Sequence, residues 1–383
     1  MQPVDVAVVG AGLAGLYGAK LLAQQGHRVL LLDRKSSLEK NIHTTGIFVR
    51  KTLEDFQLPT ECLGPAVRQV MIYSPARRPL RLQSPHDEFR AGKMGSLYQH
   101  LLQECQELGV IWAGGTYYHS SQATDQGSRL FLSTHGEAWQ VETRWIVGAD
   151  GTLSRVARDL GLDINREWIV GVEDVLEGVP LQGDPCFHCF LDPQLSPGYL
   201  AWVAHDGEEV HLGVGGYAHQ FKPLQALEKF RASLRGIIDL SQARLRQRRG
   251  GSIPVGGVLP HIVNRRGLLL GDAAGAASPL TAGGLDPCLR LTTLAAEITH
   301  HYLSTGDAAI LQSYAGQQFR DRFTTRLWLR RLLASLRHPM FLETACAVLR
   351  LPPFQSLAWK IMFGRSEHAS FPDIEPMIEP KIL

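Results

Sequence analysis

Three glycines and one acid near the N-terminus have the spacing of a nucleotide site. The run 6–15 contains Gly10, Gly12 and Gly15, and Asp33 follows 21 residues after Gly12. Gly10 permits a sharp turn after a strand, Gly12 lets a pyrophosphate approach the backbone, and Gly15 lets the next helix pack close to the sheet. A carboxylate at this distance can accept hydrogen bonds from a ribose. The pattern predicts dinucleotide binding, and the alternative is a glycine-rich turn that holds no ligand.

Two later segments repeat the pattern of a strand followed by a glycine turn. The first ends in Asp150-Gly151 and enters a helix, and the second ends in Gly271-Asp272 before a loop of small residues and a long helix. Backbone N–H groups at such a helix N-terminus can approach a flat or anionic ligand. The ligand contacts expected from these segments are Asp150, Gly151, Gly271, Asp272, Gly283, Gly284 and Leu285.

Together, the three segments resemble the flavin-dependent oxidoreductases that share the fold of aromatic hydroxylases and geranylgeranyl reductases. The resemblance spans about residues 1–330 and implies FAD as cofactor, with its adenine half at the N-terminal glycines. It implies an α/β fold, with a Rossmann-type three-layer FAD-binding domain, an inserted antiparallel β-sheet substrate domain and C-terminal helices. The resemblance adds five candidate FAD contacts, namely Leu13, Ala14, Arg34, Thr45 and Arg90.

A narrower similarity points to the geranylgeranyl reductase group. That group carries a Tyr-x-Trp strand and then a G-x-G strand, which here correspond to Tyr199, Trp202 and the pair Gly213 and Gly215. The Tyr–Trp spacing is one residue longer than in the group, and the loop 43–47 lacks the group's cysteine. The similarity implies that Tyr199 and Trp202 line a substrate pocket, with ordinary core packing as the alternative.

The rest of the chain has to position these groups. Short β-rich segments between residues 165 and 262, with a hairpin signal at Asp206-Gly207, predict an antiparallel sheet over the flavin. We expect an FAD-binding unit from residues 1–164 and 263–310, a substrate domain at 165–262, and a helical region with a tail at 311–383. An arginine-rich stretch between Lys222 and Arg249 has a helix-like sequence.

Composition and the chain start limit the possible function classes. The formal net charge is +2, which gives no global field for nucleic acid, so we expect no nucleic-acid partner. No apolar run reaches the length of a membrane span, and the first motif starts by Val6, which predicts a cytoplasmic protein without a leader. Cys186 and Cys189 fit two ordinary thiols on a strand better than a metal site, and we expect no metal.

The region after residue 318 has helical periodicity with many arginines. Apolar residues recur at helical spacing between Phe319 and Arg337, and arginines cover the other side. This predicts a helix that packs on the body with a charged outer face, or an interfacial helix in peripheral contact with anionic lipid. Pro352-Pro353 is expected to end the helical run, and a loose tail is expected from Ser366.

Three functions remain open at this point. The preferred one is reduction of carbon–carbon double bonds in a hydrophobic, isoprenoid or lipid-like small molecule by hydride from reduced FAD. The alternatives are a monooxygenase acting through a flavin hydroperoxide, and a non-catalytic prenyl-protein escort. NAD(P)H would be a transient electron donor, because no second G-x-G-x-x-G occurs. The sequence does not identify the catalytic side chains or the oligomeric state.

Asp286 follows Gly283, Gly284 and Leu285, where the resemblance places small or apolar residues close to the flavin. Its carboxylate either turns away as a helix cap or tunes the flavin.

Overall fold

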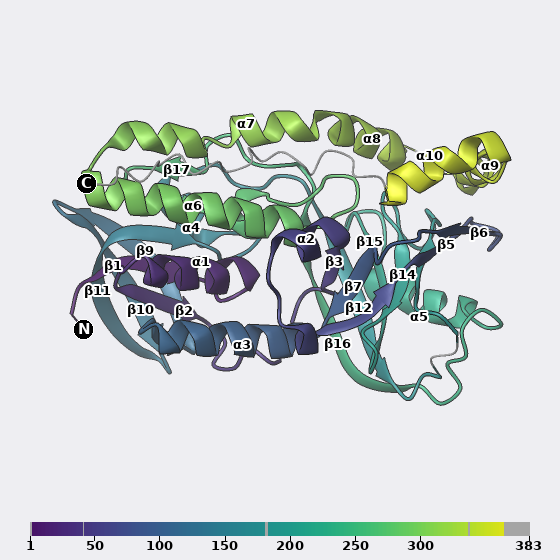
Figure 1. Ribbon diagram of the computed structural model, residues 1–383, viewed down its shortest axis with the longest axis horizontal. Helices are drawn as coiled ribbons and strands as arrows, with labels where there is room; N and C mark the ends of the chain where they lie inside the picture. The colour runs from purple at the N-terminus through teal and green to yellow at the C-terminus, as the bar shows by residue number, and fades with distance from the viewer. Residues whose placement is uncertain (1, 41, 181–182, 336–337, 364–383) are drawn as a thin grey trace.

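The computed structural model describes residues 2–40, 42–180, 183–335 and 338–363. Figure 1 shows two sheets side by side, with helices α1, α3 and α6 over the first and a run of C-terminal helices along the edge of the molecule. The predicted tail from Ser366 lies outside the described residues. Within the described part of the chain, no helix is both long enough and apolar enough to pass through a bilayer.

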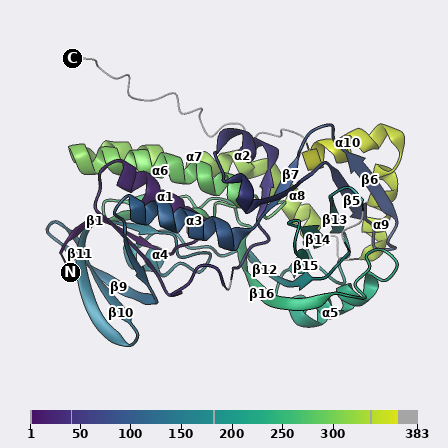
Figure 2. The same ribbon diagram turned by 60° about the horizontal axis from the view of Figure 1, so that its bottom comes forward.

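The first sheet is the predicted nucleotide-binding layer. Its central strands pair in parallel, and their side chains are almost entirely apolar and buried, as expected for strands covered on both faces. An antiparallel hairpin, β9–β10, extends this sheet at one end (Figure 2). The strands are β1 (Val4–Val9), β2 (Val29–Asp33), β8 (Ile111–Gly114), β9 (Thr116–Thr124), β10 (Gly127–Thr134), β11 (Glu137–Gly148), β17 (Val263–Asn264) and β18 (Gly267–Leu269).

Helices α1 and α6 pack tightly on this sheet. A Cβ added to Gly18 of α1 would lie 3.1 Å from Leu270 and 3.3 Å from Thr292 of α6, so the two helices approach closely there. The largest apolar core of the molecule fills the space between these helices and the strands. The helices of this half are α1 (Leu13–Gln24), α3 (Met94–Glu107), α4 (Arg155–Leu160) and α6 (Leu285–Thr305).

The second sheet is mainly antiparallel and contains the four strands expected between residues 165 and 262. The hairpin at Asp206-Gly207 is confirmed, and Gly207 adopts φ +98° in its turn. Helix α5 (Pro223–Ser233) covers one face, with Leu227 and Phe230 fully buried (Figure 2). The strands are β16 (Arg244–Pro254), β12 (Trp168–Glu177), β15 (Val210–Gly216), β14 (Ala201–His205), β13 (Cys186–Phe190), β5 (Gln69–Tyr73) and β6 (Pro79–Gln83).

The sheet membership adds detail to the expected domain division, which stays a prediction. Strands β5 and β6 come from residues 69–83, inside the range assigned to the FAD-binding unit, yet β5 pairs in parallel with β13 of the second sheet. A third, small sheet and helix α2 (Arg50–Asp55) lie between the two halves of the molecule (Figure 1). Its strands are β3 (Ile47–Val49), β7 (Phe89–Gly92) and β4 (Leu63–Val67).

The arginine-rich stretch is a strand in its second half, so the expectation of one helix to Arg249 was wrong. Helix α5 ends at Ser233, and Arg244–Pro254 form β16 along β12. The reason is cross-strand charge pairing: Asp174 lies opposite Arg248, and Glu173 lies opposite Arg249. These pairs outweigh the weak helical preference of the sequence.

The C-terminal region is helical as predicted, with one correction. The helix before Pro352-Pro353 does end, at Leu349, but the helical region continues, because Pro352 begins a further helix, where a missing N–H costs no hydrogen bond. The last of these helices packs on β6 through Ala358 and Phe363. The helices are α7 (Gln317–Arg320), α8 (Thr324–Ser335), α9 (Pro339–Leu349) and α10 (Pro352–Phe363).

Candidate functional site

The N-terminal glycine turn has the geometry that an anionic ligand requires. A Cβ on Gly15 would lie 1.8 Å from the Gly10 carbonyl oxygen, and one on Gly10, at φ +104°, would lie 2.3 Å from that of Ala149. A Cβ on Gly12 would meet no atom within 4 Å. Gly12 is also the N-cap of α1 and supplies no side-chain hydrogen bond to its free N–H groups. Open space therefore faces the positive end of this helix.

Asp33 lies beside this turn at the end of β2. Its Oδ2 accepts a 2.7 Å hydrogen bond from the Ala11 N–H, and its Oδ1 accepts one of 2.8 Å from the Lys35 N–H. These two bonds fix the carboxylate against the glycine loop, where it retains further lone pairs for a ribose. The neighbouring candidate Arg34 is exposed, while Leu13 and Ala14 are buried in the first turn of α1.

The Asp150-Gly151 segment lies next to the same turn, and the Asp150 carboxylate accepts hydrogen bonds from the start of α4. Asp150 accepts hydrogen bonds from the Ser154 hydroxyl at 2.6 Å and from the N–H groups of Arg155 and Val156, and it thereby holds the start of α4. Burial raises the pKa of this carboxyl despite these donors. A Cβ on Gly151 would meet no atom within 4 Å, so the backbone rather than the acid faces open space.

The Gly271-Asp272 segment lies against the first turn of α1 and the N-terminus of α6. A Cβ on Gly271 would lie 2.9 Å from the Ala14 Cβ, and the Asp272 Oδ1 lies 3.6 Å from a Cβ placed on Gly284. Burial raises the pKa of the Asp272 carboxyl to about 6. Gly284 is the N-cap of α6 without a side-chain cap, and Gly283 precedes it in an exposed position. Leu285 begins the helix.

The fold therefore brings several features to one edge of the first sheet. They are the uncapped N-termini of α1 and α6, the open positions at Gly12 and Gly151, and the buried acid Asp272. This arrangement fits an extended ligand with a central pyrophosphate and a flat ring system, as FAD has. Arg90, another predicted FAD contact, donates a 2.8 Å hydrogen bond from its Nε to the Gly64 carbonyl and links β7 to β4, and its contact with the cofactor stays a prediction.

Tyr199 and Trp202 lie in recesses made by the G-x-G strand. A Cβ on Gly213 would fall 2.2 Å from the Trp202 ring, and one on Gly215 would fall 2.8 Å from the Tyr199 ring. The two rings are 6.3 Å apart, edge to face. The Tyr199 hydroxyl donates a 2.6 Å hydrogen bond to the Thr281 carbonyl, in the loop before α6. The second sheet thus contacts the cofactor loop through an aromatic side chain.

A buried network of charged side chains, centred on Glu173, lies behind Trp202. The sequence motifs do not predict this network. Glu173 Oε2 accepts hydrogen bonds from Thr45 at 2.6 Å and from the Trp202 indole N–H at 3.2 Å, while Oε1 pairs with Arg249 and with His211 at 3.5 Å. These donors lower the pKa of Glu173 to about 2 although burial opposes ionisation. Thr45, a predicted FAD contact, is therefore held by β12. The available signal was a charged pair, Glu173-Asp174, inside an apolar strand.

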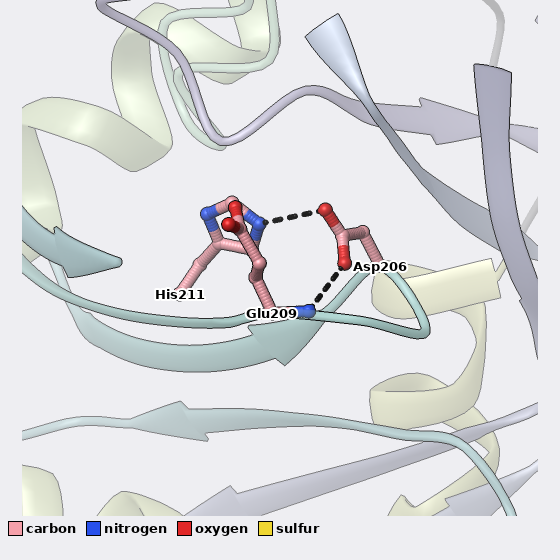
Figure 3. A group of neighbouring side chains, drawn as sticks. All are labelled: Asp206, Glu209 and His211. Carbon is pink, nitrogen blue, oxygen red and sulfur yellow. Dashed lines mark hydrogen bonds and ion pairs between the residues drawn. The ribbon is translucent and has the colours of Figure 1, made fainter. Parts of the chain in front are cut away.

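His211 belongs to the same network, and its Nδ1 also lies 3.0 Å from Arg249 Nη2. Its ring lies between Glu173 and Asp206, 3.5 Å from a carboxylate oxygen of each, and these partners raise its pKa to about 9. Figure 3 shows His211 and Asp206 with Glu209, three side chains whose ligand atoms lie within 4.8 Å of one another. Asp206 also accepts from the Glu209 N–H, and Glu209 pairs with Arg246. Ion pairs and hydrogen bonds link the three residues to one another and to Arg246.

Asp286, the unusual acid at the start of α6, is directed to α2 and to its own helix. It accepts a 2.9 Å hydrogen bond from the Thr52 hydroxyl and pairs with Arg290, whose Nη2 lies 2.9 Å from Oδ1. Arg290 also contacts Asp55 at 2.6 Å. The Asp286 charge is therefore neutralised within a buried cluster at the side of the helix.

The sequence pattern of the FAD binding domain family matches residues 3–325. The chain belongs to this family. It is an FAD-dependent oxidoreductase, as the three glycine motifs predict, and it is similar in sequence to geranylgeranyl reductases.

Relatives that match most of this chain include reductases from Methanocella arvoryzae and Methanopyrus kandleri. The digeranylgeranylglycerophospholipid reductase of Methanocella arvoryzae is 24% identical over 80% of this chain and 79% of its own length. Digeranylgeranylglycerophospholipid reductase 1 of Methanopyrus kandleri is 28% identical over 83% of this chain and 88% of its own.

Solved structures confirm the fold. A geranylgeranyl bacteriochlorophyll reductase-like protein from Thermoplasma acidophilum aligns with a TM-score of 0.81 at 20% identity, covering 90% of both chains. The p-nitrophenol 4-monooxygenase of Pseudomonas putida aligns with a TM-score of 0.71 at 16% identity, covering 96% of this chain and 95% of its own.

Proposed function

We propose that this FAD-dependent oxidoreductase saturates carbon–carbon double bonds of an isoprenoid or other lipid-like substrate. The observation that carries the proposal is the Tyr199–Trp202 pair, seated on Gly213 and Gly215 and hydrogen-bonded to the loop before α6. It is supported by relatives that are named as reductases of a geranylgeranylated phospholipid and that match over most of their length.

In this proposal the first sheet binds the cofactor through its backbone. The N–H groups at the start of α1 and the open face of Gly12 hold the pyrophosphate, and Asp33 accepts from the adenosine ribose. Asp272 and the N-terminus of α6, at Gly283 and Gly284, hold the ribityl chain and the flavin ring. When bound, FAD supplies the hydride, while the protein supplies orientation and electrostatics.

The second sheet provides the wall of the substrate pocket. Tyr199 and Trp202 present aromatic surface to a hydrophobic chain, and the Glu173 carboxylate fixes the Trp202 ring and Thr45 from behind. Because Glu173 is ionised and fully partnered, we assign it a positioning role. NAD(P)H is the proposed electron donor and would bind transiently.

A single-turnover experiment tests the reductase proposal. The FAD-loaded protein is reduced without oxygen and mixed with a geranylgeranylated lipid, and the return of the oxidised flavin spectrum is followed. We expect reoxidation that depends on the lipid and a product that gains two hydrogens, at one double bond for each flavin reoxidised. Reduction of the bound flavin by NADPH or NADH in the same apparatus tests the donor.

The second candidate function is insertion of an oxygen atom into the substrate. The fold similarity to the p-nitrophenol 4-monooxygenase supports this candidate. The same reduced protein is mixed with air instead. A substrate product that gains an oxygen atom would assign the chain to the monooxygenases, whereas slow reoxidation without an oxygenated product supports the reductase.

We also propose that the C-terminal helices touch a lipid surface. Most of the large apolar side chains that are exposed in the described residues lie between residues 328 and 361, including Trp328 at 67% and Phe341 at 62% exposure. Arg331 is exposed beside Trp328, its guanidinium 6.0 Å from the ring. Co-sedimentation with anionic vesicles tests this, and a Trp328→Ala, Phe341→Ala double variant is expected to lose binding.

A further inference from the structure

Arg330 on α8 departs from the expectation that the arginines of this helix form a solvent-facing side. It is 2% exposed, while its neighbour Arg331 is exposed. Its Nε donates a 3.2 Å hydrogen bond to the Tyr217 hydroxyl. Nη1 and Nη2 are buried and have no hydrogen-bond partner, and within the described ranges no carboxylate pairs with this guanidinium.

A buried guanidinium without a counter-charge is an unfavourable arrangement. Arginine stays protonated in proteins, so the group cannot escape the cost by losing its proton. Two aromatic rings flank it: the guanidinium carbon lies 5.8 Å from the Tyr199 ring centroid and 5.0 Å from that of Tyr217. These cation–π contacts stabilise the charge but leave the N–H donors of Nη1 and Nη2 unsatisfied.

We propose that Arg330 binds an oxyanion, a phosphate or carboxylate group, at the head of the substrate. The two free nitrogens form the planar end of the guanidinium, which matches two oxygens of such a group in a bidentate contact. The proposal rests on the proposed function only in assigning the anion to the substrate. It narrows the substrate class to an acidic amphiphile with an unsaturated chain.

The position of Arg330 relative to the cofactor loop supports this assignment. Tyr199, against which the guanidinium packs, donates its hydroxyl hydrogen to the Thr281 carbonyl, two residues before Gly283. Arg326, one turn earlier on α8, contacts the Ser278 hydroxyl of the same loop at 3.4 Å. An anion on Arg330 would therefore be separated from the loop before α6 by the Tyr199 ring alone.

A second unpartnered polar atom occurs in the segment that carries Tyr199. The Ser196 hydroxyl oxygen is fully buried and has no hydrogen-bond partner. Two residues later, a Cβ on Gly198 would lie 2.6 Å from the Tyr217 ring and 3.8 Å from the Ala334 Cα of α8. This segment therefore packs against both the helix and the ring that hold Arg330.

Calorimetric binding to the FAD-loaded protein tests the proposal without turnover. The probes are a prenyl monophosphate, the matching neutral prenyl alcohol and inorganic phosphate. We expect the monophosphate to bind wild-type protein at least about tenfold more tightly than the alcohol, since a charge-assisted bidentate contact is lost with the alcohol. Arg330→Met should remove this preference and Arg330→Lys should weaken it. Arg235→Met, at an exposed arginine away from α8, is the control and should keep it.

The stability of the variants separates a binding role from a structural one. If the free Arg330 charge serves a ligand, Arg330→Met should unfold at the same temperature as wild type or higher when no anion is present. If Arg330→Met fails to fold, Arg330→Lys replaces it in the binding experiment. A weaker preference for the monophosphate over the alcohol in Arg330→Lys then supports the binding role.

Each outcome has a defined meaning. Binding of inorganic phosphate alone with the same dependence on Arg330 supports an oxyanion site and assigns it to free phosphate rather than a lipid head group. Equal binding of monophosphate and alcohol to wild type, or an unchanged preference in Arg330→Met, would overturn the proposal. Because no reaction is measured, a failure of the reductase assay alone leaves this test intact.

Discussion

In the first sheet the candidate site consists of backbone, whereas in the second sheet it consists of buried side chains. At Gly10 and Gly15 the chain packs so closely that no Cβ fits, and Gly12 leaves open space at a helix end. On β12 and β15 the carboxylate of Glu173 and the ring of His211 are buried among charged partners. Backbone sites depend on local spacing, while side-chain networks depend on strand register, so the two halves should respond differently to mutation and pH.

The largest expected effect is the loss of the buried acid in the second sheet. Glu173→Leu leaves Arg249 without its carboxylate and His211 with Asp206 alone, and breaking such a buried pair costs about 3–5 kcal/mol. Denaturant unfolding measures the free energy of unfolding. The control is Glu142→Leu, whose exposed pair with Arg129 is worth about 1 kcal/mol or less. Similar losses in both variants would remove the distinction between the two kinds of ion pair.

The same network predicts a stability maximum in mildly acidic solution. The pKa of Glu173 falls from 4.5 to about 2, so its contribution is present above pH 4.5 and is lost as pH falls towards 2. The pKa of His211 rises from 6.5 to about 9, so its contribution is present below pH 6.5 and is lost as pH rises through 9. Urea unfolding across this range should show both decreases, and Glu173→Gln should flatten them. Equal stability at about pH 6 and about pH 10 in the wild type would contradict this account.

In the first sheet, Gly15→Ala should damage folding and FAD binding together. The added methyl group would lie 1.8 Å from the Gly10 carbonyl oxygen, and overpacking of this kind costs about 1–3 kcal/mol. The unfolding free energy and the FAD content of purified protein are measured side by side. Full FAD content at wild-type stability would show that this close approach is not required.

Gly12→Ala should affect the ligand and leave the fold intact. Gly12 has φ −76°, which alanine adopts freely, and its Cβ would enter open space, so we expect stability within about 0.5 kcal/mol of wild type. FAD affinity should fall by about tenfold or more, because the methyl group faces the pyrophosphate path. Titration of the apoprotein with FAD measures this, and unchanged affinity would place the cofactor elsewhere.

The smallest effect is expected at Asp286, where a side-chain charge lies near the backbone site. Because Arg290 neutralises it, Asp286→Asn should shift the flavin midpoint potential by less than about 30 mV, the value of a tenfold change for a two-electron couple. Spectroelectrochemical titration tests this. A larger shift would mean that Asp286 tunes the flavin.

The contrast between the sheets also explains what the sequence could predict. The glycine motifs, the strands of residues 165–262 and the Asp206-Gly207 hairpin are local patterns, and the structure contains all of them. The pairing of β5 with β13 and the strand at Arg244–Pro254 depend on partners distant in sequence. The burial of Arg330 could not be predicted, because helical periodicity places it among exposed arginines and does not show that a segment distant in sequence covers it.

The central claim is that the chain reduces an acidic, unsaturated lipid with electrons from FAD. The most direct measurement is one anaerobic turnover of the reduced holoprotein with a prenyl monophosphate, followed by mass spectrometry of the lipid. The account predicts flavin reoxidation that requires the lipid, a product in which one double bond has gained two hydrogens, and a strong decrease in Arg330→Met. An unchanged lipid without oxygen, together with an oxygenated product once air is admitted, would contradict it.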